Sequence, residues 1–542
     1  MAQARELDRC LSIGAWNDLH GQIGPDEPVV DTGAVPAGGV VALADAISDL
    51  RSSPDTLVLL DAGDLFMGPL ESTLAEGAPI IEAYRVIGVD AVSIGNHEFD
   101  FGPVGYETVY AIPGVGDGAG AQGPRGALLA RMRSANFPFL SANIHLAGGA
   151  RPRWPHFAAS VHIRRGTFDV GVVGYTTQET PSTTSRANVV DLDFSTNAAA
   201  SVAAEIRALR ASGASPVVLL AHASLDGALP QQLDDPTSQQ HHGELATLVA
   251  ELGADRPDVI IAGHRHAWML GRIDGIPTVS SDRHGIGLAR IRFCRVKRSL
   301  ELRSIERMAV IASSPPRTSL GRDVNAATAP WVAAVKATGE APVTTLPRDC
   351  PVQNVNGTAG AEQVAIGMMA HASDAAVHPD GVPLVAMVNS GGIRAPLRRG
   401  VVRYADLFLS FPFETTVAIC ATTRAGFAHV LRNALRDPSA WKEFPFALAG
   451  AKATVEIRKD ATLSLIGFTI DGDKGAPVDN SPVWLVVPDF ILDGGDGFLE
   501  GVVCVASSRS STRIRDAWRE VLARDPEGCS GAPHNVVIRL AK

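Results

Sequence analysis

The chain has 542 residues, and its 58 acidic residues outnumber its 48 lysines and arginines, so its formal net charge is −10. With 46% hydrophobic and 20% charged residues it has enough apolar material for more than one packed core, which excludes global disorder. The negative charge offers no general attraction for a nucleic acid backbone, so we expect no nucleic acid polymer as partner.

Six short apolar runs in the first 300 residues predict buried strands. Each run ends in a polar cluster and is followed by a helical segment, which is typical of an α/β layered fold. Histidine, aspartate or asparagine residues follow five of the runs, and open α/β sheets place their sites at the carboxyl ends of strands. The runs cover residues 11–16, 56–60, 91–94, 169–173, 216–220 and 258–261.

A change in composition after residue 310 predicts a domain boundary. We expect one domain over residues 1–310, a linker rich in Pro, Ser, Ala and Thr over 311–345, and a second domain over 346–542. The second domain has its own loop motifs, which begin at Asn389, Phe411 and Asp489.

The six cysteines are spread along the chain without a Cys-x-x-Cys pair, which favours unpaired thiols in a reducing compartment over a disulfide framework. The first ten residues lack the apolar stretch of a secretory signal, and no stretch reaches about 18 apolar residues. We therefore expect a cytoplasmic protein without membrane association, or an exported one if a signal has been removed.

The polar clusters supply the ligands for two metal ions. A two-metal hydrolytic centre needs about seven imidazole, carboxylate or amide ligands, one of them bridging. Asp18 and His20 are two residues apart, so both point to one face of an extended segment. Asp64 follows Gly63, which permits a sharp turn, and its two oxygens suit a bridging role. We expect one ion at Asp18, His20, Asp64 and His266, and the other at Asp64, Asn96, His222 and His264.

The predicted ligands contain no thiolate, which suits Zn, Mn, Fe or Co without choosing among them. Two such cations would lower the pKa of a bridging water and yield hydroxide for in-line attack on phosphorus. His97 would then stabilise the transition state or protonate the leaving oxygen, with Asp100 orienting its ring. The alternative for His97 is a structural role behind the ligands. We expect Glu98 to support the turn and not to catalyse.

The other histidines lie outside these motifs, and we expect them to be solvated or core residues: His145, His156, His162, His241, His242, His284, His371, His378, His429 and His534.

The order of these motifs resembles the calcineurin-like metallophosphoesterases, and the later loop motifs resemble the two-domain 5′-nucleotidase branch of that superfamily. The motifs are Asn-Asp-x-His-Gly at 17–21, Gly-Asp at 63–64, Gly-Asn-His-Glu at 95–98, His222 and Gly-His-x-His at 263–266. The resemblance implies an N-terminal β-sandwich flanked by helices and a C-terminal α/β substrate domain. It implies the same ligand set and the same His97–Asp100 pair. The chain departs from the family around His222, where Ala221 and Ser224 replace the usual neighbours.

The resemblance also implies a substrate site in the second domain. Asn389 and Arg394 would contact substrate, Phe413 and Phe490 would sandwich a base, and Asp496 would contact ribose. The family normally has an Arg and, later, a Gly-Asn pair in the segment that here covers residues 360–368. The arginine is absent and Met368 replaces the Asn, which leaves open whether another arginine takes its place: Arg348, Arg398 or Arg399.

The leading interpretation is a dinuclear metal-dependent phosphohydrolase of the 5′-nucleotidase type, which releases phosphate from nucleotides or a related small phosphoester. One alternative keeps the centre but changes the substrate, as in a cyclic-nucleotide phosphodiesterase or a sulfur-ester hydrolase. Another is a non-catalytic, metal-containing ligand-binding protein. The oligomeric state is not predicted.

Overall fold

The structure is a computed structural model that describes residues 10–25, 35–103, 123–225, 230–235, 242–297, 299–351, 359–375, 381–436, 444–458, 462–471, 478–530 and 535–540. The chain divides into two compact units. One unit comprises residues 1–184 and 188–334, and the other comprises 185–187 and 335–542. The division falls within helix α9 (Ser319–Gly339), inside the segment predicted as a linker.

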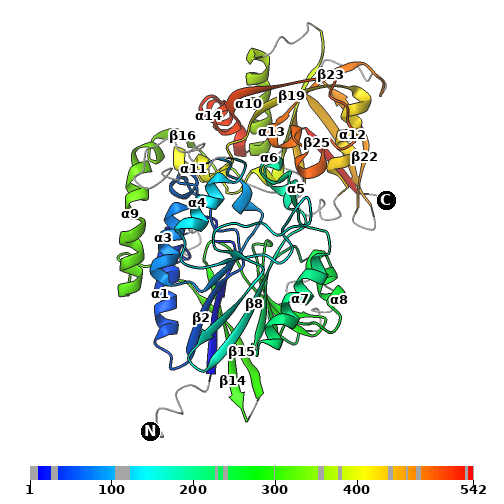
Figure 1. Ribbon diagram of the computed structural model, residues 1–542. Coiled ribbons are helices and arrows are strands. Elements are labelled where there is room, and N and C mark those ends of the chain that lie inside the picture. Colours follow the sequence, from blue (N-terminus) through cyan, green and yellow to red (C-terminus); the bar gives the residue numbers. More distant parts are fainter. Residues whose placement is uncertain are drawn as a thin grey trace. The chain divides into compact units, whose positions relative to one another are not determined.

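The first unit is a sandwich of two β-sheets (Figure 1). One sheet has seven strands in the order β15-β14-β1-β2-β3-β4-β6, and the other has six in the order β12-β13-β11-β10-β8-β7. Leu60 of the first sheet and Leu220 of the second belong to one buried cluster, so the core lies between the sheets. The strands of the first sheet are β1 (Cys10–Trp16), β2 (Thr56–Asp61), β3 (Ala91–Ser93), β4 (Phe139–Leu140), β6 (Phe157–Ala158), β14 (Gly287–Val296) and β15 (Ser299–Ala309).

The second sheet carries three of the predicted buried strands. Its strands are β7 (Ser160–Arg165), β8 (Phe168–Thr176), β10 (Val217–His222), β11 (Val259–Gly263), β12 (Trp268–Ile273) and β13 (Ile276–Ser281). All six predicted runs form strands, namely β1, β2, β3, β8, β10 and β11. Within each sheet these predicted strands run parallel to one another, so their carboxyl ends meet at one edge. A small ladder of β5 (His145–Leu146) and β9 (Leu192–Asp193) lies outside the two sheets.

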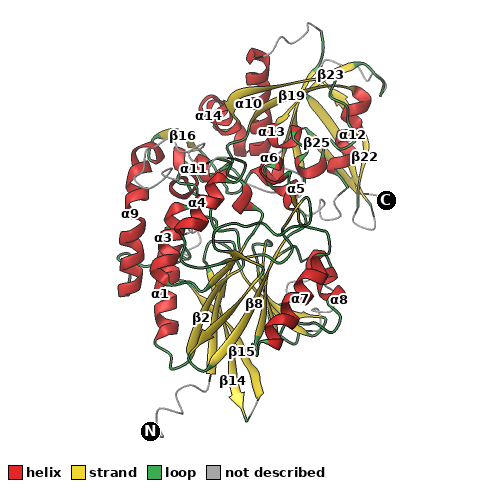
Figure 2. Ribbon diagram, viewed as in Figure 1, coloured by secondary structure: helices red, strands yellow, loops and turns green. Residues whose placement is uncertain are grey.

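Helices flank this sandwich on both sides, as predicted (Figure 2). Apolar residues of α7 and α8 pack on the outer face of the six-stranded sheet. No helix among the described residues is both long and apolar enough to cross a membrane. The helices of this unit are α1 (Val40–Arg51), α2 (Leu70–Thr73), α3 (Ala78–Ile87), the 3-10 turn η2 (His97–Phe99), α4 (Gly126–Ser134), α5 (Thr180–Thr183), α7 (Ala198–Ala211) and α8 (Glu244–Glu251). Helix α6 (Arg186–Val189) spans the division between the units at residues 187 and 188.

The second unit is built on a mixed five-stranded sheet in the order β20-β17-β23-β19-β24. A three-stranded sheet β22-β21-β25 and a pair β16-β18 accompany it. One buried cluster packs α10 and α14 on the larger sheet, and a second packs α12 and β21, which confirms the predicted α/β class.

The strands of the second unit are β16 (Pro342–Leu346), β17 (Leu384–Asn389), β18 (Gly400–Arg403), β19 (Thr416–Thr423), β20 (Phe446–Ala449), β21 (Ala451–Ile457), β22 (Leu463–Ile470), β23 (Pro482–Pro488), β24 (Ala506–Arg513) and β25 (Val536–Leu540). Its helices are α10 (Ala359–Ala375), α11 (Tyr404–Ser410), α12 (Arg424–Ala434), α13 (Asp489–Leu492) and α14 (Ile514–Arg524), with 3-10 turns η4 (Ser390–Gly392), η5 (Gly495–Gly497) and η6 (Gly528–Ser530).

The six cysteines form three disulfides, so the prediction of unpaired thiols was wrong. The pairs are Cys10–Cys294, Cys350–Cys529 and Cys420–Cys504, and their partners are 284, 179 and 84 residues apart in sequence. Cys10 and Cys294 face each other across the antiparallel strands β1 and β14. The register of the sheet brings these two sulfur atoms together, and no local spacing pattern in the sequence predicts this pairing.

Removal of the Cys350–Cys529 bond is expected to destabilise the second unit. A crosslink across a long loop restricts the unfolded chain and typically stabilises a protein by about 2–4 kcal/mol. The double variant Cys350→Ser/Cys529→Ser should lose about that much free energy of unfolding in urea titrations. Addition of dithiothreitol should lower the stability of the unmodified chain more than that of the variant. If dithiothreitol left the free energy of unfolding of the unmodified chain unchanged, the prediction would be wrong.

Candidate metal centre and substrate-contact residues

The seven predicted ligand residues lie where the parallel strands of the first unit end. Asp18 and His20 follow β1, Asp64 follows β2 and Asn96 follows β3. His222 ends β10, and the last two follow β11: His264 and His266. All seven are buried or half-buried, so the cluster is largely shielded from solvent at the edge of the sandwich.

The backbone at this edge is unusual. Five of the seven residues have φ between 47° and 80°, a left-handed conformation that costs a residue with a side chain about 1–3 kcal/mol. Backbone hydrogen bonds hold it: the N–H of Asp18 donates to Gly63 O and that of His20 to Asp64 O, both at 2.9 Å. Gly95 must be glycine, because a Cβ there would lie 2.1 Å from Asp64 Oδ1. The five residues are Asp18, His20, Asp64, His264 and His266.

The first ligand group brings together Asp18, His20, Asp64 and His266, whose ligand atoms lie within 4.8 Å of one another. His20 Nδ1 is 3.0 Å from the carbonyl of Met67, so Nδ1–H donates there and Nε2 keeps its lone pair. That Nε2 lies 2.8 Å from His266 Nε2 and 3.6 Å from Asp64 Oδ2. The lone pairs of these nitrogen and oxygen atoms therefore point toward one another, and a cation bound between the atoms would relieve their repulsion.

The second ligand group is Asp64, His222 and His264, with Asn96 among them. His222 Nδ1 donates to Ala62 O at 2.9 Å, so Nε2 is the ring nitrogen that faces the other residues of this group. Nε2 lies 3.1 Å from Asp64 Oδ2, 3.2 Å from Asn96 Oδ1 and 3.3 Å from His264 Nδ1. Because Asp64 belongs to both groups, its carboxylate has the bridging place that a two-metal site requires.

The electrostatics of this buried cluster favour a cation. Burial opposes protonation of His222, but the carboxylate of Asp64, with Asp18 and Glu98 nearby, raises the pKa of His222 to about 10. Burial likewise opposes ionisation of Asp64, yet His222 and His97 hold its pKa well below the usual range. The donor set is therefore chemically suited to divalent ions.

His97 and Asp100 form the predicted pair. His97 Nδ1 donates to Asp100 Oδ2 at 2.7 Å, and Thr184 Oγ1 donates to Asp100 Oδ1 at 2.7 Å. The His97 ring centroid is 5.3 Å from that of His20, and its backbone N–H donates to Asp64 Oδ1 at 2.9 Å. His97 therefore lies against both the ligands and the oriented carboxylate.

Glu98 supports the turn. Its carboxylate accepts hydrogen bonds from the backbone N–H groups of Asp64, Leu65 and Gly95 at 2.6–2.9 Å. Burial and the neighbouring Asp64 raise the pKa of Glu98 to about 7. Its contacts join the loops after β2 and β3.

Sequence reasoning missed two residues at this centre. His284 was expected outside it, but its ring centroid lies 6.1 Å from that of His20 and its N–H donates to Asp18 O at 2.7 Å. Glu179 Oε2 lies 3.6 Å from His264 Nε2. The available signal was position, because His284 follows β13 and Glu179 follows β8.

In the second unit, three of the predicted substrate-contact residues lie at or next to strand ends on one edge of the five-stranded sheet. Asn389 ends β17, which is parallel to β23, and Phe490 follows β23. Phe413 precedes β19, which is antiparallel to β23, so its loop reaches the same edge. Asn389 Nδ2 donates to Asp496 Oδ2 at 2.8 Å, and the Arg394 guanidinium lies 6.0 Å from the Phe413 ring centroid.

Arg515 of α14, which sequence reasoning did not single out, holds the loop that carries Phe413. The Arg515 side chain is 1% exposed and pairs with Glu414. Its Nη1 donates to the carbonyls of Phe411 at 3.0 Å and Phe413 at 3.4 Å, and its guanidinium lies 3.9 Å from the Phe408 ring centroid. A buried, fully engaged cation thus fixes this loop.

The segment that departs from the family pattern is part of the core. Met368 is completely buried in α10, within an apolar cluster. The amide of an asparagine there would need hydrogen-bond partners to offset its burial. Of the open substitutes for the missing arginine, Arg398 is ion-paired with Asp349 at 3.3 Å and Arg348 is exposed.

Two protein families match the chain. The calcineurin-like phosphoesterase family matches residues 11–268, and the 5′-nucleotidase C-terminal domain matches residues 339–501.

Curated relatives include a snake venom 5′-nucleotidase of Gloydius brevicauda, 31% identical over 176 residues, which are 32% of this chain and 26% of that protein. The 5′-nucleotidase of Rattus norvegicus is 31% identical over 179 residues, 32% of this chain and 27% of that protein. Endonuclease YhcR of Bacillus subtilis is 24% identical over 411 residues, 74% of this chain and 31% of that protein. The chain therefore spans between a quarter and a third of the length of these relatives.

Solved structures share the fold. A 5′-nucleotidase precursor from Thermus thermophilus has a TM-score of 0.78 at 19% identity, covering 98% of this chain and all of that one. The sulfate thiohydrolase SoxB from the same organism has a TM-score of 0.69 at 16% identity, covering 97% of this chain and 96% of that one.

Proposed function

We propose that this chain, which belongs to the calcineurin-like phosphoesterases and joins such a domain to a 5′-nucleotidase C-terminal domain, hydrolyses small phosphoesters at a centre of two divalent metal ions. The observation that carries the proposal is the pair of ligand groups that share the buried carboxylate of Asp64. One ion is assigned to the first group and the other to the second, with Asn96 as an amide ligand of the latter.

In the proposed reaction the chain's own residues orient substrate and move a proton. When bound, two divalent cations activate water and neutralise charge on phosphoryl oxygens. His97 carries its Nδ1 proton toward Asp100, so Nε2 is the atom that hands a proton to the leaving oxygen. Thr184 keeps the Asp100 carboxylate in place for this task.

Nucleotides are the proposed substrates. Asn389 and Arg394 are assigned to polar contacts with substrate, Asp496 to the ribose, and Phe413 and Phe490 to the base. The support is the shared sheet edge, the Asn389–Asp496 hydrogen bond and the Arg515 contacts that fix the Phe413 loop. A stacking site accepts any base, because every base has an aromatic face.

Phe413→Ala and Phe490→Ala are each expected to raise KM for nucleoside monophosphates by about 5- to 140-fold, since a stacked base contributes about 1–3 kcal/mol. KM for ribose 5-phosphate, which has no base, should stay within about twofold of its original value. Phe413→Tyr keeps the aromatic face and serves as the matched control. Equal losses on both substrates would contradict a base-contacting role.

A panel of nucleotides, cyclic nucleotides, sugar phosphates and sulfur esters, assayed with added manganese or zinc, tests the function itself. Hydrolysis of nucleoside monophosphates would support the proposal. Activity confined to cyclic nucleotides or sulfur esters would favour the second candidate, which the fold similarity to a sulfate thiohydrolase keeps open. No activity on any compound, with two ions bound, would favour a non-catalytic role.

The proposed place of action is an oxidising compartment. Disulfides persist outside reducing compartments, and all six cysteines are paired. This replaces the expectation of a cytoplasmic protein. Mass spectrometry of the chain from its native cells, after alkylation without reductant, would reveal free thiols if the proposal fails.

A further inference from the structure

One carboxylate outside the predicted ligand set faces the candidate metal centre. Glu179 Oε2 lies 3.6 Å from His264 Nε2. The other nitrogen of the same ring, Nδ1, lies 3.1 Å from Asn96 Oδ1 and 3.3 Å from His222 Nε2. The two ring nitrogens therefore face different partners: Nδ1 faces the second ligand group, and Nε2 faces the carboxylate.

An imidazole that ligates through one nitrogen carries its proton on the other, and an acceptor for that proton fixes the tautomer and the ring orientation. We infer that Glu179 is a positioning residue for the second metal ion, which acts by accepting the Nε2 proton of His264 and so directing Nδ1 toward that ion. The inference rests on the proposed two-metal function, because His264 is a ligand only within it.

Hydrogen bonds to α8 hold the loop that carries Glu179 in place. Glu244, the first residue of that helix, accepts hydrogen bonds from Thr177 Oγ1 at 2.5 Å and from Gln178 N–H at 2.7 Å. The N–H of Glu179 in turn donates to Thr177 Oγ1 at 3.2 Å. These hydrogen bonds, through the Thr177 hydroxyl and the backbone N–H groups of Gln178 and Glu179, limit where the Glu179 carboxylate can reach, which suits an orienting role.

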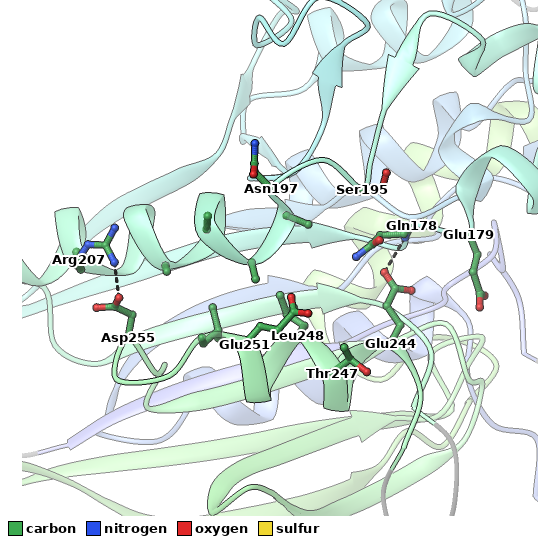
Figure 3. A pocket seen from close by; sticks show the side chains of 15 residues that line it. Gln178, Glu179, Ser195, Asn197, Arg207, Glu244, Thr247, Leu248, Glu251 and Asp255 are labelled. Carbon is green, nitrogen blue, oxygen red and sulfur yellow. Dashed lines mark hydrogen bonds and ion pairs between the residues drawn. The ribbon is translucent and has the colours of Figure 1, made fainter.

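Glu179 also borders an open cleft of about 860 Å³ between α7 and α8. Figure 3 shows it at one end of this cleft, with the ion pair of Arg207 and Asp255 at the other. Its side chain is 52% exposed, so a substitution removes little buried packing. Glu251 lines the same cleft on α8 and provides a matched acidic control.

The test titrates metal-free protein with Co²⁺ in chelator-buffered solution, because visible absorption of Co²⁺ reports its coordination. Glu179→Ala should weaken one of the two sites by about 10- to 100-fold, the usual cost of losing such a partner, and leave the other unchanged. Glu179→Gln keeps an acceptor and should lie between Ala and the original. Glu251→Ala should bind like the original chain. The thermal midpoint of each metal-free variant verifies folding.

Two outcomes would overturn the inference. Glu179→Ala could bind both ions as tightly as the original, or both acidic substitutions could weaken both sites alike, which would be a general charge effect. Failure of the proposed function looks different: the unsubstituted chain then either binds fewer than two Co²⁺ ions, or binds two and hydrolyses none of the compounds in the panel.

Discussion

Replacement of Asp64 by Ala is expected to release both metal ions and to lower kcat/KM by about 10³-fold or more. The carboxylate belongs to both ligand groups, and metal-ion catalysis supplies several kcal/mol of transition-state stabilisation, each 1.36 kcal/mol being about tenfold in rate. Metal content by mass spectrometry and turnover of a nucleoside monophosphate are the measurements.

The control for this prediction is Asp234→Ala, which removes a carboxylate whose side chain is 84% exposed on the same unit. It should retain two ions and full activity. Circular dichroism should show both variants folded. If Asp64→Ala kept two ions, the bridging assignment would be wrong, and if it kept one, Asp64 would serve a single ion.

His97→Ala should lower kcat by about 10²- to 10⁴-fold while leaving metal content intact, since this is the usual contribution of a positioned proton donor. The loss should be largest for nucleotides, whose leaving alkoxide needs a proton. It should shrink for p-nitrophenyl phosphate, whose leaving group departs without one. Asp100→Asn should have the same pattern with a smaller effect, because the ring then loses its orienting carboxylate.

The alternative for His97 is structural, since its backbone N–H also donates to Asp64. Alanine preserves that backbone contact, so the substitution isolates the ring. Loss of metal ions from His97→Ala would favour the structural role. An equal drop on both kinds of leaving group would exclude proton donation.

The buried strands and the clustering of the proposed ligand residues could be predicted because their signals are local. A buried parallel strand is a continuous apolar run, and the residue after it lies at the functional edge, so the runs before Asp64 and Asn96 located both side chains. Asp18 and His20 needed only their spacing. The prediction reached only those features that are encoded within a single segment of the sequence.

Two of the misses, the disulfides and Arg515, depend on contacts between residues that are distant in sequence. Cys10 and Cys294 meet only because β1 and β14 pair in one register, and no run of residues encodes that meeting. In the sequence, Arg515 has the pattern of an ordinary helix residue. Its contact with the loop that carries Phe413 arises only when α14 packs against that loop. Glu179 and His284 follow strands as the ligands do, but without the neighbouring residues of a motif they are indistinguishable from solvated side chains.

The left-handed backbone at Asp18, His20, Asp64, His264 and His266 means that the stability of the folded state depends on whether metal ions occupy the ligand cluster. Without cations, the fold must sustain both this strain and the crowding of lone pairs. A ligand that binds only the folded chain stabilises it by RT ln(1 + [L]/Kd). The availability of metal in the surroundings would then set how long the folded chain persists as well as how fast the proposed reaction proceeds, so that scarcity of metal would limit abundance and the proposed activity together.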